Sequence, residues 1–265
     1  MMRPTNNYEY IQVKIQDQIL SLTLNRPSKK NALNQKMIQE INSVLDENKA
    51  SEKIRVVLIL SNSDVFCAGA DLEYLDKIKD FKYEEHLQDS RELMSLFKNM
   101  LQYPKLIIAK VAGAAIAGGC GLMTACDITF ATKESKFGYP EVKIGFAPAL
   151  VSTFILQKIH ETKARELMLT GNIISAEEAK KIGLIHHLYS NIEIDEKITE
   201  FMNLFIKSTS SNSIKNTKQI MYESMNLDIK LEKAAELNAS TRMHSDFKKG
   251  INSFLNKEPI NWQEK

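Results

Sequence analysis

The 265-residue chain has few cysteines, and their arrangement excludes two classes of protein. Cys67, Cys120 and Cys126 are an odd number, and they show neither a Cys-x-x-Cys pair nor the Cys/His spacing of a zinc site. A disulfide framework and a metal site are therefore not expected. Each thiol is predicted to be buried and inert, in a reducing, cytoplasmic setting.

Long apolar runs and a charge of one sign are also lacking. The most apolar run, residues 111–126, is shorter than the roughly 20 residues that span a bilayer. Residues 1–10 lead into no apolar stretch, so no secretory signal is expected. The formal net charge is only +2, and Lys and Arg are scattered evenly. We therefore expect a protein that neither enters a membrane nor binds nucleic acid.

The pattern of apolar residues predicts a mixed α/β core. Hydrophobic residues make up 43% and charged residues 26% of the chain, as in ordinary globular domains. Alternating or continuous apolar runs predict strands at residues 8–15, 19–24, 54–60, 106–111 and 127–131. Helical spacing is found over residues 31–48, 84–101 and 119–125.

The rest of the chain has helical patterns. Gly171 is placed as a helix C-cap, and Ser175-Ala176-Glu177-Glu178 forms a capping box for a helix that ends near Gly183. Beyond about Ile194 the amphipathic patterns are long and no convincing strand is found. We expect a boundary near residue 195, with a core at residues 1–195 and a helical segment at residues 196–265.

Two loops after predicted strands carry small residues, which let a ligand come close to the backbone. They are Phe66-Cys67-Ala68-Gly69-Ala70-Asp71 and Ala115-Ile116-Ala117-Gly118-Gly119-Cys120-Gly121. A helix that starts near Gly119 adds partial positive charge at the second loop. Either loop alone is equally consistent with a tight strand-to-helix turn. Together they have the build of an oxyanion hole, which would stabilise the enolate of a thioester.

These loops and several other segments, in order and spacing, resemble the enoyl-CoA hydratase/isomerase (crotonase) family. The matching segments are Leu24-Asn25-Arg26-Pro27 with Asn31-Ala32-Leu33, and residues 66–71, 117–120, 125–127, 137–145 and 169–179. The resemblance implies a spiral of β-β-α turns that forms two near-perpendicular sheets flanked by helices. It also implies a C-terminal helical segment that packs homotrimers, often paired into hexamers. The implied substrate is an acyl-CoA thioester, with no separate cofactor.

The resemblance further implies roles for individual residues. The backbone N–H groups of Ala68 and Gly118 would form the oxyanion hole. The segment Ala68-Gly69-Ala70-Asp71 would line the pantetheine arm of CoA. Lys29 or Lys30 would meet the CoA phosphates, although an ordinary solvated lysine is the simpler explanation for either one.

The best-known hydratases of this family hold a water between two glutamates, and this chain has one of them. The second matches Glu141, whereas the first is replaced by Gly121. A glycine cannot transfer a proton, so Glu141 is the only obvious acid/base among the matched positions. Ala149 stands where 3-hydroxyisobutyryl-CoA hydrolases and dienoyl-CoA isomerases carry an Asp, and both branches are therefore disfavoured.

Residues 141–152, together with residues 119–122, are most similar to bacterial methylglutaconyl-CoA hydratases of leucine breakdown. We therefore expect an enoyl-CoA hydratase that adds water across the C2–C3 double bond. An enoyl-CoA isomerase that uses a single Glu is the alternative. A polyketide-associated dehydratase or decarboxylase and a non-catalytic CoA- or RNA-binding homologue are further alternatives.

Overall fold

The first element of the fold is the predicted hairpin at the N-terminal end of the chain. In the computed structural model, which describes residues 8–263, β1 (Ile11–Gln16) pairs antiparallel with β2 (Ile19–Leu24). Asp17 and Gln18 connect the two strands with φ values of 50° and 65°. Positive φ at both central residues is the requirement of a type I′ turn, whose twist matches that of the flanking strands.

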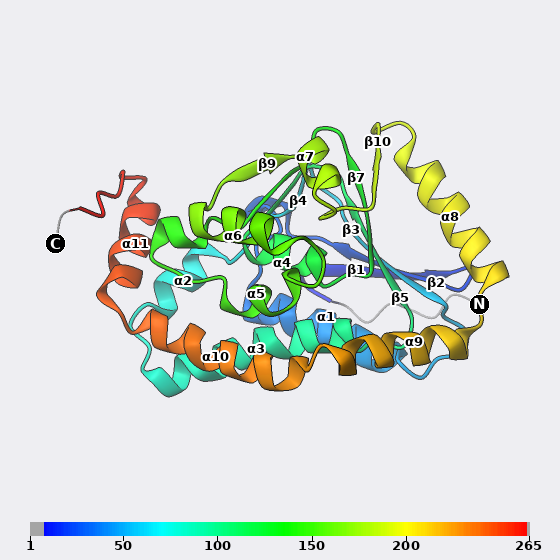
Figure 1. Ribbon diagram of the computed structural model, residues 1–265, viewed down its shortest axis with the longest axis horizontal. Coiled ribbons are helices and arrows are strands. Elements are labelled where there is room, and N and C mark those ends of the chain that lie inside the picture. The colour runs from blue at the N-terminus through cyan, green and yellow to red at the C-terminus, as the bar shows by residue number, and fades with distance from the viewer. Residues whose placement is uncertain (1–7, 264–265) are drawn as a thin grey trace.

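A six-stranded sheet grows from this hairpin (Figure 1). Its further strands are β3 (Val56–Ser61), β5 (Leu106–Val111), β7 (Ile128–Thr132) and β10 (His187–Tyr189), in the order β1-β2-β3-β5-β7-β10. Apart from the hairpin, all neighbouring strands in this sheet are parallel. Parallel strands are usually covered on both faces, which explains why the sequence shows continuous apolar runs here.

A second sheet contains β4 (Val65–Cys67), β6 (Ala114–Ile116), β8 (Lys136–Gly138) and β9 (Ile173–Ser175), in that order. After a short turn, β3, β5 and β7 are followed by β4, β6 and β8 of this sheet, and helices then return the chain. This repeat is the predicted β-β-α spiral. Because β4, β6 and β8 pair in parallel, their carboxyl ends lie at the same edge. The residues that follow these three strands therefore meet there.

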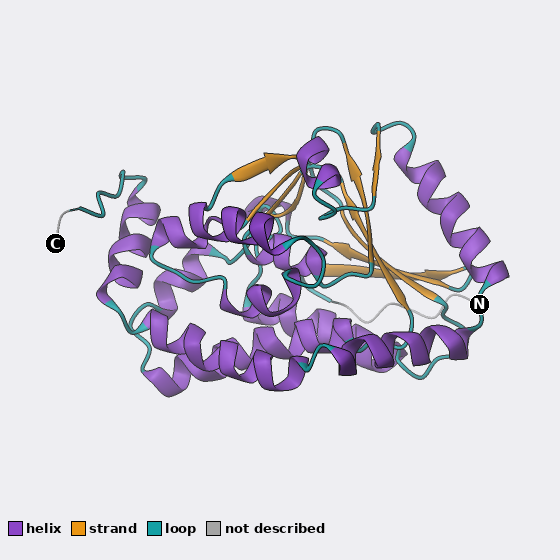
Figure 2. Ribbon diagram, viewed as in Figure 1, coloured by secondary structure: helices purple, strands orange, loops and turns teal. Residues whose placement is uncertain are grey.

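Helices surround the two sheets (Figure 2). They are α1 (Gln35–Asn48), α2 (Leu72–Ile78), α3 (Tyr83–Leu101), α4 (Gly118–Thr124), α5 (Ala149–Ile155), α6 (Glu161–Thr170), α7 (Ala176–Lys181), α8 (Ile194–Ser208), α9 (Ser211–Ser224), α10 (Leu227–Arg242) and α11 (Ser245–Asn256), with 3-10 helices η1 (Pro27–Lys29) and η2 (Pro140–Ile144). Gly171 ends α6 in the left-handed region, and the Ser175 side chain caps α7, as predicted.

The helices after residue 194 contact the core at several places. α8 covers one face of the six-stranded sheet, where the rings of Phe201 and Phe130 lie 5.4 Å apart. α10 lies along α3 and also contacts α5, whereas α11 contacts α2 and η2 (Figure 1). A separate helical unit at residues 196–265 that packs trimers stays a prediction.

Two expectations about burial and loops can be compared directly with the fold. The three cysteines are buried and unpaired, and burial raises the pKa of each thiol to about 12. No helix or strand was expected over residues 72–78, where the structure has α2. Over residues 8–263, no helix combines the length and the apolar character needed to cross a membrane.

Candidate active site

The loops after β4 and β6 touch each other at the common edge of the second sheet. Gly69 has a φ of 97°, and a Cβ at this position would lie 2.9 Å from Ala117 Cβ and 3.0 Å from Ile116 O. A Cβ at Gly119 would lie 2.2 Å from the carbonyl oxygen of Cys67. Only glycine fits at either position. The start of α4 therefore packs directly on the end of β4.

Ala68, one of the two expected oxyanion donors, already has an acceptor for its N–H inside the protein. Its backbone N–H donates to the carbonyl oxygen of Lys30 over 3.1 Å. Lys30 presents this carbonyl from the left-handed region, with a φ of 51°. The Ala68 N–H is thus occupied by a structural hydrogen bond, which argues against Ala68 as a donor to substrate.

Ala70, two residues further on, presents a backbone N–H that is not used in this way. Leu33 pairs with it in an isolated parallel bridge, in which Leu33 N–H donates to Gly69 O over 2.7 Å and Asp71 N–H donates to Leu33 O over 2.9 Å. These bonds engage the residues on both sides of Ala70, so its own N–H faces the other way. Within residues 8–263 no group accepts a hydrogen bond from it.

Gly118, the other expected donor, begins α4, where the first N–H groups of a helix have no partner within the helix. No acceptor for its N–H is found in the described part of the chain. Ala117 before it has φ 50° and ψ −125°, a strained conformation that turns the chain sharply into the helix. A Cβ on Gly69 would lie 3.5 Å from Gly118 N. The structure therefore places two free N–H groups, of Ala70 and Gly118, on touching loops.

Glu141 lies in η2, after β8, and its side chain is buried with 6% of the residue exposed. Its Oε2 atom has no hydrogen-bond partner among the described residues. Burial raises the pKa of this carboxyl to about 7, against a smaller lowering by a backbone hydrogen bond. A carboxyl with such a pKa takes up and releases protons near neutral pH, as a general acid/base must.

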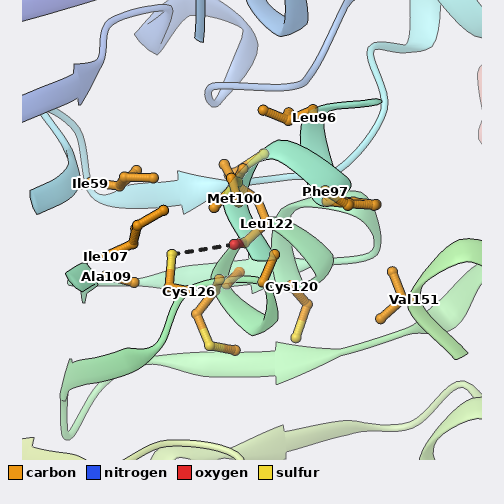
Figure 3. Close-up of a cluster of buried hydrophobic side chains, with 14 of the residues drawn as sticks. Ile59, Leu96, Phe97, Met100, Ile107, Ala109, Cys120, Leu122, Cys126 and Val151 are labelled. Carbon is orange, nitrogen blue, oxygen red and sulfur yellow. Dashed lines mark hydrogen bonds between the residues drawn. The ribbon is translucent and has the colours of Figure 1, made fainter. Parts of the chain in front are cut away.

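The position of the missing glutamate is filled by other side chains. A Cβ on Gly121 would lie 2.6 Å from Val151 Cγ2 and 3.2 Å from Phe97 Cζ. Figure 3 shows Phe97 and Val151 beside α4, in one apolar cluster with Cys120 and Leu122. The ring of Phe97 also packs edge-on against Phe154 from α5, 5.4 Å away. Any side chain at residue 121 would therefore require Val151 and Phe97 to move.

The carboxylate of Asp71 has a structural role. It caps α2 by accepting from Tyr74 N–H over 3.0 Å, and it forms an ion pair with Arg26. Burial opposes ionisation, but the bonds from Tyr74 and Arg26 lower the pKa of Asp71 on balance. Any contact of this residue with a ligand therefore comes from its backbone.

Tyr139, which precedes η2, is fully buried, and its hydroxyl shares a hydrogen bond of 2.6 Å with Thr124 Oγ1. Tyr139 is thus a packing residue. Lys29 pairs with Glu73, and both side chains are exposed. Lys30 is also exposed.

Sequence reasoning missed Asn31 as a residue that holds the site together. Its buried side chain accepts from Arg26 N–H over 2.7 Å and donates to Ser61 Oγ over 2.7 Å and to Val65 O over 3.1 Å. It thereby ties the segment before Leu33 to the β3–β4 turn. Its φ of 52° is a conformation that Asn tolerates better than most residues, but no pattern in the sequence indicated this conformation.

A separate cavity lies away from the site. A cavity of about 1190 Å³ lies between α9 and the segment after α1, lined among others by Arg55, Lys105 and Tyr222. It contains none of the residues described above. Within residues 8–263, no group of three His, Cys, Asp or Glu side chains could hold a metal ion.

Comparison with known proteins agrees with this geometry. A family model described as enoyl-CoA hydratase/isomerase matches residues 14–265. The chain belongs to this family. A crystal structure of an enoyl-CoA hydratase from Mycobacterium avium is similar with a TM-score of 0.84 at 27% identity, over 96% of this chain and 98% of that one.

Named relatives align with most of the length of this enoyl-CoA hydratase/isomerase. A Thermus thermophilus protein, provisionally named an enoyl-CoA hydratase, is 35% identical over 89% of this chain and 94% of its own length. The 2,3-dehydroadipyl-CoA hydratase of Escherichia coli is 29% identical over 92% of this chain and 95% of its own length.

Proposed function

We propose that the protein is an enoyl-CoA hydratase, which adds water across the C2–C3 double bond of an acyl-CoA thioester. The observation that carries this proposal is the buried Glu141 carboxyl, one oxygen of which has no hydrogen-bond partner among residues 8–263, and whose pKa is raised to about 7 by burial. It lies at the same sheet edge as the free N–H groups of Ala70 and Gly118.

In the proposed reaction, the thioester oxygen accepts hydrogen bonds from the N–H groups of Ala70 and Gly118. These bonds strengthen as negative charge moves onto the oxygen, so they favour the enolate; removing one such donor typically costs about 3 kcal/mol. Ionised Glu141 takes one proton from a water while the water oxygen bonds to C3. The protonated carboxyl then returns this proton to C2, and the addition of water is complete.

The remaining residues of the expected site bind the CoA portion. The backbone of Ala68-Gly69-Ala70-Asp71 lines the pantetheine arm, and the small side chains keep the approach open. The exposed amines of Lys29 and Lys30 meet the phosphates. Lys29 would exchange its contact with Glu73 for this one, at little cost because exposed ion pairs contribute little.

The acyl group is proposed to be that of methylglutaconyl-CoA, on the similarity of residues 141–152 to hydratases of leucine breakdown. A relative named 2,3-dehydroadipyl-CoA hydratase supports hydration of an enoyl-CoA in general but says nothing on this acyl group. We also propose a cytoplasmic homotrimer or dimer of trimers. The molar mass measured by light scattering tests the assembly.

An enoyl-CoA isomerase is the second candidate, and the filled space at Gly121 favours it. An isomerase needs one carboxyl that removes a proton from C2 and returns it to C4, and Glu141 alone can do this. The test is a panel of 2-enoyl- and 3-enoyl-CoA thioesters, with and without a distal carboxylate, analysed by mass spectrometry. A product heavier by one water shows a hydratase, whereas a shifted double bond without added mass shows an isomerase.

A further inference from the structure

A buried ion pair links the two halves of the site through residues outside it. Asp89 of α3 and Arg242, the last residue of α10, form this pair, with 13% and 5% of their side chains exposed. Asp89 uses its other oxygen to accept from the hydroxyl of Tyr74 in α2. The guanidinium carbon of Arg242 lies 5.1 Å from the ring centre of Phe146.

Tyr74 connects the pair to the oxyanion side of the site. Its backbone N–H is held by the carboxylate of Asp71, the N-cap of α2, and Asp71 directly follows Ala70. A shift of α2 would therefore move the Ala70 N–H. The tyrosine hydroxyl is the only contact in the described chain by which Asp89 reaches this helix through a hydrogen bond.

Phe146 connects the pair to the base side. Its backbone N–H donates to the carbonyl oxygen of Glu141 over 3.0 Å, closing the turn that follows η2. Its ring lies between Arg242 and Phe247 of α11, whose ring centre is 5.7 Å away. The guanidinium thus packs on the residue that fixes the backbone of Glu141.

The neighbouring His86 does not disturb the ion pair between Asp89 and Arg242. His86, one turn before Asp89, has no exposed surface, and neither of its ring nitrogens has a partner in residues 8–263. Burial and the Arg242 charge lower the pKa of this histidine to about 4, so it is neutral at physiological pH. It does not compete for the Asp89 carboxylate.

We propose that Asp89 and Arg242 are positioning residues, which hold the Ala70 segment and the Glu141 segment at a fixed separation. The inference rests on the proposed function, because that separation sets how a thioester oxygen and the proton-transferring carboxyl face each other. Effective catalysis requires such alignment, and a misplacement of about 1 Å can lower a rate by about a hundredfold.

The chain offers a matched control. Arg91 and Glu232 also join α3 to α10, two residues from Asp89 and ten from Arg242 along the chain, but their side chains are 42% and 39% exposed. Neither is hydrogen-bonded to Tyr74 or packed on Phe146 in the described structure. Breaking this second pair tests the general effect of loosening α10 from α3.

The experiment compares Tyr74→Phe, Arg242→Lys and the control Arg91→Gln by backbone hydrogen exchange and by turnover. Tyr74→Phe removes only a hydroxyl, and Arg242→Lys keeps the charge, so both variants are expected to fold. We expect exchange at least about threefold faster in residues 68–75 for Tyr74→Phe, and in residues 68–75 and 140–146 for Arg242→Lys. Exchange in β5 should stay unchanged in both, and Arg91→Gln should alter none of these segments.

In the same variants kcat should fall by about tenfold or more while KM for the thioester changes little. A purely structural role would lower the melting temperature and leave kcat per folded molecule unchanged, and that result would overturn the proposal. So would exchange that changes no more than in Arg91→Gln. If the wild type turns over no thioester, the proposed function fails, and the exchange comparison alone decides whether the pair holds the two segments.

Discussion

Restoring the missing carboxylate with Gly121→Glu should damage the protein rather than improve it. A side chain at this position meets Val151 Cγ2 at 2.6 Å and Phe97 Cζ at 3.2 Å from its first carbon. Overpacking of this kind costs about 1–3 kcal/mol. The glutamate must also bury a carboxyl among apolar groups without a partner, which adds roughly 2 kcal/mol or more.

Replacing a helical glycine recovers about 1 kcal/mol of backbone entropy, so the net loss for Gly121→Glu is about 2–4 kcal/mol. For a chain of this size that lowers the melting temperature by about 4–16 °C. Gly121→Ala meets the same two atoms but buries no carboxyl, so it should lower stability by about 2 kcal/mol or less.

Calorimetry on wild type, Gly121→Ala, Gly121→Glu and the double variant Gly121→Glu/Val151→Ala measures these differences. The double variant makes room for the new side chain, so it should lose less stability than the sum of its two single changes. If Gly121→Glu keeps the melting temperature within about 2 °C and hydrates faster than the wild type, the reasoning from packing at this position is refuted.

Three further outcomes are expected. Replacing the Ala70 amide by an ester, with lactic acid in place of alanine, should slow turnover by about a hundredfold. The same change at Ala68 should mainly lower stability. Equal turnover rates for the two ester variants would refute Ala70 as the donor. Folding raises the Glu141 pKa from 4.5 to about 7, so between these pH values the folded state binds more protons than the unfolded state. The free energy of unfolding should therefore fall by up to roughly 3 kcal/mol as the pH rises through this range. Urea titrations at several pH values measure this fall, and Glu141→Gln should abolish it. Millimolar acetyl-CoA or acetoacetyl-CoA should raise the melting temperature, and nucleotides without the pantetheine arm should do much less; no shift would contradict CoA binding.

The long elements of the fold could be predicted because each is long enough for its spacing of apolar residues to repeat. β5 was expected at residues 106–111 and occupies these residues, and α3 begins one residue before its expected start. The strands β4, β6 and β8 have three residues each, too few to show alternation, so no strand was predicted for them. α2 was missed for the same reason, since seven residues give two turns of apolar spacing.

The site was predictable where a side chain carries the chemistry, as for Glu141. The site was less predictable where backbone groups carry the chemistry. Whether the N–H of Ala68 is free depends on the Lys30 carbonyl, and the direction of the Ala70 N–H depends on the bridge to Leu33; both partners lie in a loop almost 40 residues earlier in the chain. Likewise, the sequence shows that Gly121 lacks a carboxylate, but Phe97 and Val151 fill its place only through tertiary packing.

The central claim is that a single carboxyl, Glu141, performs the proton transfers of the reaction. The most direct measurement is the rate of 3-hydroxyacyl-CoA formation by wild type and Glu141→Gln, at matched occupancy by the enoyl-CoA. Gln keeps the shape of the side chain but cannot take up a proton, so the rate should fall by about 10² to 10⁴ with little change in binding. A Gln variant that retains most of the wild-type rate would contradict the account.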